Sequence, residues 1–210
     1  MKKILFLLFF CCFFCFSQNA IAPEKIFVYP WPSFANTSAP FCVYGLVDAP
    51  GDYEEYYLAY RENTSKIEDD HYKRKEKVAQ EGEKTTYHLV FTHWVIGELF
   101  RLEEIHEKVA VDSGPMMQIV SYSLSYPGLQ KTNLWMVRKC LLEKSKSSWV
   151  GDKFKHLQIE IAFINMGQNR TRIYLRMELD AEGKRSLEKV EQEAFKALAN
   201  ILQCKKLGKK

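Results

Sequence analysis

Residues 157–179, LQIEIAFINMGQNRTRIYLRMEL, decide the fold that this sequence predicts. Apolar side chains alternate with mostly polar ones along 157–163 and again along 173–179, the period of a strand with one buried face. The Asn/Gly-rich stretch between the two runs suits a hairpin loop. From about Ser186 an apolar stripe follows at helical spacing: Leu187, Val190, Ala194, Leu198, Ile201 and Leu202. We therefore expect two paired strands and a long amphipathic C-terminal helix.

Three more strands are predicted before this unit, at 85–96, 99–111 and 117–126, with clear turn signals between them. The first is apolar on both faces, which predicts a central strand covered on both sides. Residues 132–144 follow, and their apolar side chains predict a helix with a polar N-terminal cap. The apolar stripe of this predicted helix consists of Leu134, Val137, Leu141 and Leu142.

The N-terminal half gives weaker signals. Prolines punctuate 23–50, so the short strands predicted at 26–29 and 41–47 should lie at sheet edges or strand starts. Residues 52–60, DYEEYYLAY, fit a helix or a strand, and we interpret them as a strand. The very polar stretch 64–84 predicts a solvated helix or a long surface excursion. The whole order predicts an α+β fold in which an antiparallel sheet, a meander plus the C-terminal hairpin, packs against two helices, the longer one C-terminal.

Residues 1–20 have the pattern of a cleaved secretory signal peptide, with cleavage between 17 and 22. A basic start precedes the apolar run 4–16, which is shorter than the roughly 20 residues that a membrane-spanning helix needs. No later run is long and apolar enough to span a bilayer, so no transmembrane helix is expected in the mature chain. A lipid anchor on one of the early cysteines is the less favoured alternative, with Cys11, Cys12 or Cys15 as the acceptor.

The mature chain is expected to be one domain over residues 23–210, exported to the periplasm or secreted, with a basic tail at 205–210. The formal net charge is +4, and loss of Lys2 and Lys3 with the signal would leave +2. A nearly neutral chain argues against a nucleic-acid binder. The remaining cysteines are Cys42, Cys140 and Cys204. Their odd number allows at most one internal disulfide, and the sequence leaves the pairing open.

Residues 103–107, EEIHE, contain the Glu-x-x-His spacing of some metal sites. In the predicted strand, however, Glu104 and His106 share a face, and we interpret the segment as a solvated charged rim. The sequence has no HExxH pattern, no G-x-S-x-G elbow and no glycine-rich phosphate loop. We therefore assign no catalytic, cofactor-binding or metal-binding residue, expect no cofactor, and lean against an enzyme.

Two groups of residues are candidates for binding. The first is a set of aromatic side chains that could line a ligand pocket or belong to the core: Phe91, Trp94, Tyr122, Tyr126 and Trp135. The second lies on the polar face of the closing hairpin, where Arg172, Arg176 and Glu160 are expected to be exposed. This face predicts either cross-strand ion pairs or a polar binding surface.

Two alternating strands followed by a long amphipathic helix, over Leu157–Gln203, resemble the end of helix-grip (START-like) lipid-binding domains. The resemblance implies a ligand held between sheet and helix. The helix predicted at 132–144 departs from the order of elements in that family.

The first functional hypothesis is an exported, non-catalytic protein that holds an apolar or amphipathic molecule between its sheet and its C-terminal helix. The first alternative is an envelope interaction or assembly protein that has a protein partner and no ligand pocket. The second alternative is a hydrolase, for which a buried histidine beside a nucleophile would be the sign.

Overall fold

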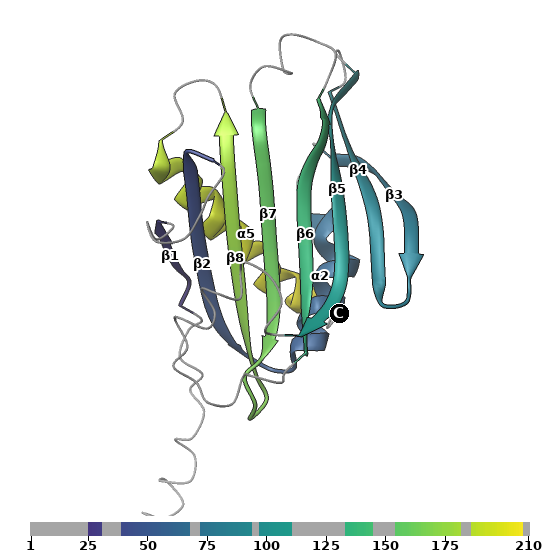
Figure 1. The fold of residues 1–210 in the computed structure, drawn as a ribbon. Helices are drawn as coiled ribbons and strands as arrows, with labels where there is room; N and C mark the ends of the chain where they lie inside the picture. The colour runs from purple at the N-terminus through teal and green to yellow at the C-terminus, as the bar shows by residue number, and fades with distance from the viewer. Residues whose placement is uncertain are drawn as a thin grey trace, which may run out of the picture.

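The computed structural model describes residues 25–30, 39–67, 72–93, 97–110, 133–144, 154–181 and 186–207. These residues form one antiparallel eight-stranded sheet and two helices (Figure 1). The elements are β1 Phe27–Pro30, β2 Phe41–Pro50, α2 Tyr53–Ile67, β3 Tyr72–Glu81, β4 Lys84–His93, β5 Gly97–Ala110, β6 Asn133–Lys144, β7 Phe154–Asn165, β8 Arg170–Ala181 and α5 Leu187–Leu207.

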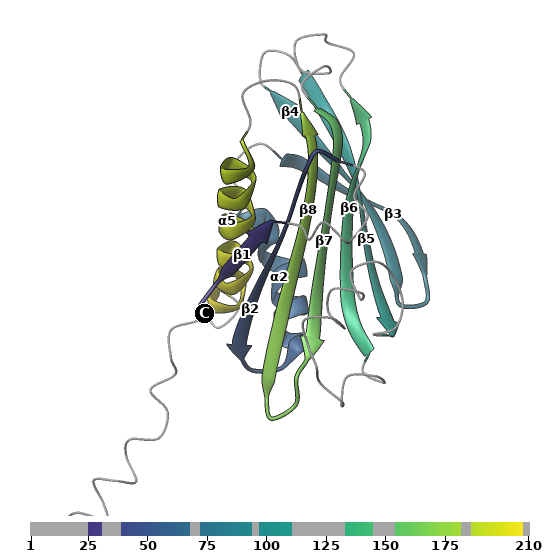
Figure 2. The same cartoon turned by 60° about the vertical axis from the view of Figure 1, so that its left-hand side comes forward.

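The strand order is β1-β2-β8-β7-β6-β5-β4-β3. Strands β3 to β8 thus form a meander, while β1 and β2 add to its far edge by pairing β2 with β8. Both helices lie on the same side of the sheet (Figure 2). The predicted α+β class, the antiparallel sheet and the long C-terminal helix are confirmed.

The C-terminal unit forms as its sequence pattern predicts. In the β7–β8 hairpin Ile161 pairs with Leu175, and both side chains are buried on the side that the helices cover. The loop reverses the chain through three residues with positive φ, namely Gly167, Gln168 and Asn169. Helix α5 follows Ser186, whose hydroxyl oxygen accepts a hydrogen bond from the Lys189 amide at 3.4 Å.

The main core lies between the sheet and the helices. Helix α5 packs on β1, β2 and β8, and α2 packs on β6, β7 and β8. Each fully buried Leu, Ile, Val or Phe side chain contributes about 1.5–3 kcal/mol. Gly45 of β2 admits α5 closely, because a Cβ atom there would lie 2.7 Å from Leu198 Cδ1. The sheet centre is also buried on its outer face, opposite the helices, by Leu134, Met136, Ala162, Ile164 and Tyr174.

The helix predicted at 132–144 is wrong, because these residues form β6. Their apolar positions fit both periods, and the surroundings select the strand. Met136 is buried on the outer face and Val137 on the helix-facing side, between β5 and β7. Short apolar runs buried on both faces cannot be told from helices by periodicity alone.

The strand predicted at 52–60 is also wrong, because residues from Tyr53 onward form α2. Asp52 caps this helix, and its Oδ1 accepts a hydrogen bond from the Glu54 amide at 2.8 Å. Glu54 and Glu55 add favourable charge to the first turn. Tyrosines at helical spacing, Tyr53, Tyr56, Tyr57 and Tyr60, pack in the main core.

The polar stretch 64–84 is not a single solvated helix, but most of its described side chains are exposed, as expected of a surface excursion. It holds the end of α2 and then β3, an edge strand that pairs with β4 in a hairpin. Strand β4 therefore lies next to an edge instead of at the sheet centre as predicted. The strand predicted at 117–126 and the signal peptide predicted at 1–20 fall outside the described residues.

The cysteines of the expected mature chain, Cys42, Cys140 and Cys204, are thiols and form no disulfide with one another. Cys42 and Cys140 lie on one row of the sheet, separated by Glu178 and Gln158 of the two strands between them. Neighbouring strands are about 4.8 Å apart, so the two thiols are too distant for a bond. In the described part of the chain, neither helix is long and apolar enough to cross a membrane.

Candidate functional site

Strands β3, β5 and β6 place four polar side chains together on the sheet surface that faces the helices. We call Lys75, Glu104, His106 and Lys139 the inner cluster. Glu104 and His106 share a face because they are two positions apart on β5. Lys139 pairs directly with Glu104 across the β5–β6 ladder. The antiparallel register thus brings together residues from distant parts of the sequence.

Glu104 is the centre of the inner cluster. Lys75 Nζ lies 2.7 Å from Glu104 Oε1, and Lys139 Nζ lies 3.7 Å from Oε2. His106 Nε2 bonds to Oε1 as well. Glu104 as a whole is only 2% exposed. Burial acts to raise its pKa, but Lys139, His106 and Lys75 outweigh burial and hold the pKa of Glu104 well below its usual range.

His106 is 0% exposed. Burial lowers the pKa of its imidazole below the ordinary value, although the bond to Glu104 opposes this effect. Its second ring nitrogen, Nδ1, has no hydrogen-bond partner among the described residues. An unsatisfied buried polar atom costs about 1–3 kcal/mol. The cluster is therefore incomplete at this one atom.

Aromatic rings surround the imidazole. The ring of Tyr87 from β4 lies 5.3 Å from it, and Tyr57 and Tyr60 from α2 lie at 5.7 and 6.4 Å. Tyr57 also stacks on Trp135 of β6, with ring centroids 4.0 Å apart. Burial raises the pKa of Tyr57 to about 12, so its hydroxyl stays protonated at neutral pH. The inner cluster is a polar spot in aromatic surroundings.

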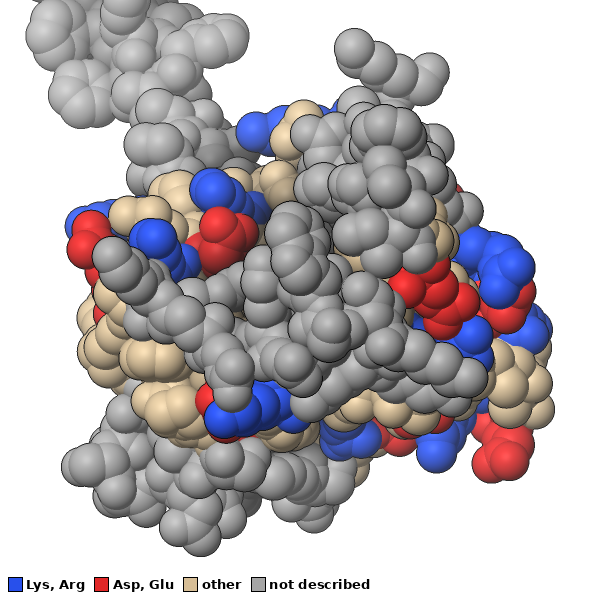
Figure 3. Space-filling view, turned by 90° about the horizontal axis from the view of Figure 1, so that it is seen from above, with Lys and Arg blue, Asp and Glu red and all other residues tan. Residues whose placement is uncertain are grey.

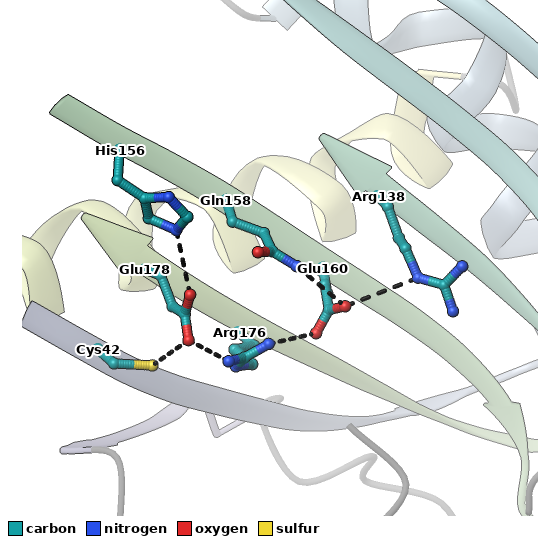
Figure 4. Close-up of polar contacts among 7 residues, drawn as sticks. All are labelled: Cys42, Arg138, His156, Gln158, Glu160, Arg176 and Glu178. Carbon is teal, nitrogen blue, oxygen red and sulfur yellow. Dashed lines mark hydrogen bonds and ion pairs between the residues drawn. The ribbon is translucent and has the colours of Figure 1, made fainter. Parts of the chain in front are cut away.

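A second group of buried charges lies on the outer face of the sheet (Figure 4). We call Glu178, Arg176, Glu160 and Arg138 the outer network. Arg176 bridges the two acids: its Nη1 lies 2.9 Å from Glu160 Oε2, and its Nη2 bonds to Glu178 Oε1. Arg138 continues the row, with its Nε 3.6 Å from Glu160 Oε1.

Neighbouring side chains complete the outer network. His156 Nε2 lies 3.2 Å from Glu178 Oε2, and the Cys42 thiol donates to Glu178 Oε1 at 3.8 Å. Gln158 donates to Glu160 at 3.4 Å. Several bonds therefore converge on each buried acid, and opposite charges alternate along the row. These ion pairs join β6, β7 and β8, and we interpret the outer network as structural.

The structure separates the two described members of the predicted aromatic pocket. Phe91 stacks on Phe100 at the start of β5, whereas Trp135 pairs with Lys108 near its end. These β5 positions are eight residues apart, about 27 Å along a strand. The other three members, Trp94, Tyr122 and Tyr126, lie outside the described residues. Whether these five aromatic residues line a pocket stays a prediction.

The polar hairpin face is not the open surface that the sequence suggests. Arg176 and Glu160 are 6% and 3% exposed, and they form a cross-strand ion pair within the outer network. Arg172 is half-buried and pairs with Asp48 of β2, its Nη2 lying 2.6 Å from Oδ2. The expected cross-strand pairing is present, but the expected exposure is wrong because this face of the sheet is buried.

The interpretation of Glu104 and His106 as a solvated rim is likewise wrong, although they do share a face. Both are buried because α2 lies over this part of the sheet. The signal in the sequence was their spacing of two inside a strand. No local pattern reports that a helix from residues 53–67 would cover them.

Positive and negative side chains are interspersed over the described part of the face in Figure 3. Pairs such as Arg101–Glu98, at 3.0 Å, show this mixing at the level of single contacts. Within the described residues no group of three or more His, Cys, Asp or Glu side chains could hold a metal ion.

Solved structures share this arrangement of sheet and helices. Human StAR-related lipid transfer protein 5 matches with a TM-score of 0.51 and 10% identity, covering 100% of both chains. The lipid transfer and protein localization domain of human StarD13 matches at 0.50 and 8% identity, covering 98% of this chain and 95% of that one. Human STARD10 matches at 0.50 and 10% identity, covering 93% and 78%.

The fold is START-like. The helix-grip arrangement suggested by residues 157–203 is thus consistent with the whole described chain, and β6 removes the one departure noted above, because it is a strand and not a helix. No family model matches the sequence, and no curated protein matches it either. At these identities the START-like neighbours establish the fold alone.

Proposed function

We propose that this protein is an exported, non-catalytic binding protein that holds an apolar or amphipathic molecule between its sheet and α2, instead of the C-terminal helix expected from the sequence. Two of the START-like neighbours carry lipid transfer in their names, which supports a lipid-like ligand. The observation that carries the proposal is the inner cluster. It places an incomplete polar group among aromatic rings, on the sheet surface that the helices cover.

An amphipathic ligand suits this surface better than a purely polar one. Its apolar part would replace contacts among rings such as Tyr57 and Trp135, and its polar end would meet the inner cluster. Buried polar groups need partners, so the inner cluster would orient the ligand and the apolar contacts would supply most of the affinity. His106 has no solvent exposure, so the ligand would enter by displacing the side chains around it.

The hydrolase alternative gains no support from the described residues. The aromatic rings in contact with the buried His106 are those of Tyr57, Tyr60 and Tyr87. A hydrolase would instead need a nucleophile such as serine or cysteine beside that histidine.

Native mass spectrometry tests the proposal. The chain is expressed with residues 1–20, recovered, and measured under native and denaturing conditions. We expect extra mass that is lost on denaturation and that is reduced in Trp135→Ala. The matched control is Phe195→Ser, an exposed position on α5, which should keep the extra mass. A chain that carries no extra mass, and takes up none from a total lipid extract, would contradict the proposal. A defined oligomer would instead favour an interaction protein.

Export is part of this proposal and has its own measurement. The expected signal predicts that the recovered protein begins between residues 18 and 23, which the intact mass reads directly. Protein that keeps Met1 and stays in the cytoplasm would contradict export without touching the ligand proposal.

A further inference from the structure

One buried nitrogen gives information about the ligand itself. His106 Nδ1 is enclosed, without exposure, and no described group donates to it or accepts from it. The other nitrogen of the same ring, Nε2, is bonded to Glu104. Because the two nitrogens of a neutral imidazole have opposite roles, the bond at one defines the role of the other.

Glu104 fixes which nitrogen carries the hydrogen. The Lys75 ammonium group lies 2.7 Å from its carboxylate, and the pKa of Glu104 is held low, so the carboxylate is ionised and can only accept. Nε2 must therefore donate. Burial keeps the imidazole neutral, so Nδ1 carries a bare lone pair. A partner for Nδ1 must therefore be a hydrogen-bond donor.

Each described element that packs around the imidazole places titratable side chains near it. They are Lys75 from β3, Tyr87 from β4, Glu104 from β5, Lys139 from β6, and Tyr57 and Tyr60 from α2. None of them donates to Nδ1. A carboxylate or an ether oxygen brings no hydrogen to this lone pair. An alkylammonium group would bring one, but it would lose its hydration in a site without solvent access.

We propose that the inner cluster recognises an uncharged hydrogen-bond donor, an aliphatic hydroxyl or amide N–H, at the polar end of the ligand, with His106 Nδ1 as the acceptor. This inference rests on the proposed function and narrows its ligand to neutral amphipathic alcohols or amides. Glu104 is a positioning residue, since it acts by fixing the tautomer of His106.

Four probes with the same alkyl chain test the inference: 1-dodecanol, its methyl ether, dodecanoate and dodecylamine. Their affinities are measured on the full chain by calorimetry or by displacement of a fluorescent apolar dye. We expect the alcohol to bind about tenfold more tightly than the ether, the effect of one buried hydrogen bond. The charged probes should bind more weakly than the alcohol.

His106→Phe removes the acceptor and keeps a ring in place. It should bind the ether as the wild type does and lose the preference for the alcohol. The matched control is His88→Phe on β4. His88 pairs with Glu103, the residue before Glu104, so its side chain points to the opposite face of the sheet from the inner cluster. This variant should therefore keep the preference for the alcohol. Circular dichroism checks that both variants are folded.

Nitrogen-15 spectra of histidine-labelled wild-type protein give a second reading that needs no variant. His106 should show a protonated Nε2 and a bare Nδ1, and 1-dodecanol should shift the Nδ1 signal while the ether does not. A protonated Nδ1 overturns the inference.

The binding outcomes separate the two proposals. Equal affinity for alcohol and ether, or tightest binding of dodecanoate or dodecylamine, overturns the inference and leaves the binding function standing. Failure of all four probes, together with failure to take up any lipid from the extract, overturns the proposed function and the inference with it.

Discussion

The inner cluster and the outer network are both buried, both charged and built on one sheet, yet only the inner cluster lies among aromatic rings and under a helix. In the outer network, Arg176 satisfies Glu160 and Glu178, and neighbouring side chains add further bonds. In the inner cluster Glu104 is equally well paired, but the His106 that it orients keeps one nitrogen without a partner. Buried charge alone therefore does not mark a binding site; the distinguishing feature here is an imidazole nitrogen without a described partner among aromatic rings.

The largest effect is expected from Arg176→Met. This change leaves two buried carboxylates, Glu160 and Glu178, without their bridging cation. Breaking a buried ion pair on one side costs about 3–5 kcal/mol. Urea denaturation should show a loss of that size in the free energy of unfolding.

Arg170→Met is the matched control, because its side chain is 60% exposed beside Asp48 and should change stability by less than about 1 kcal/mol. Similar losses in the two variants would show that the buried ion pairs of the outer network do not stabilise the fold as described above.

Glu104→Gln should come next, with a loss of about 2–3 kcal/mol at neutral pH, since Lys75 and Lys139 lose an ionised partner and keep only an amide oxygen. The pKa of Glu104 is lower in the folded chain than the roughly 4.3 expected when unfolded. Its contribution is therefore complete at neutral pH and is lost as pH falls below about 5.

Unfolding curves between pH 3 and pH 7 check this prediction. The wild-type protein and Glu104→Gln should differ most at neutral pH and approach each other as the solution becomes acidic. A difference that does not depend on pH would show that the carboxylate is not ionised in the folded protein.

The smallest effect concerns His106. Burial lowers its pKa in the folded chain below the roughly 6.5 of an unfolded histidine. Between these two values the unfolded chain binds the extra proton, so stability falls as pH drops below about 6.5, by at most about 1.4 kcal/mol per pH unit. His106→Phe should lack this part of the slope. If both proteins keep the same slope, folding does not lower the pKa of His106, and burial is not what keeps its imidazole neutral.

The sequence predicts the fold class and the C-terminal unit because their signals are local. The alternating apolar residues around Ile161 and Leu175 indicate two strands with one buried face each. The apolar stripe through Leu198 indicates a helix with one buried face. The errors at β6 and α2 have a common physical cause. Both segments are apolar or aromatic at positions that fit either period, and packing decides between them. The capping pattern of Asp52 and Glu55 was the local signal for α2 that outweighed the strand-like alternation.

The candidate site was harder to predict than the fold. The Glu104 and His106 pairing followed from strand geometry, but Lys75 and Lys139 join it only through the register of the β3–β6 ladders. Burial of the site depends on α2, which comes from a distant part of the sequence. The decisive property of the site is that His106 Nδ1 lacks a hydrogen-bond partner among the described residues. This property depends on the positions of single atoms, so no sequence pattern indicates it.

The pairing of β2 with β8 limits how early β2 can be built into the sheet during folding. Cys42 of β2 and Glu178 of β8 stand side by side although 136 positions separate them. Strand β2 therefore has no partner on that side until β8 has been synthesised, and closing so long a loop slows folding. Helix α5 follows β8 in the sequence and must also dock on β2 at Gly45. Strand β2 thus completes its packing only after β8 and α5 have been made.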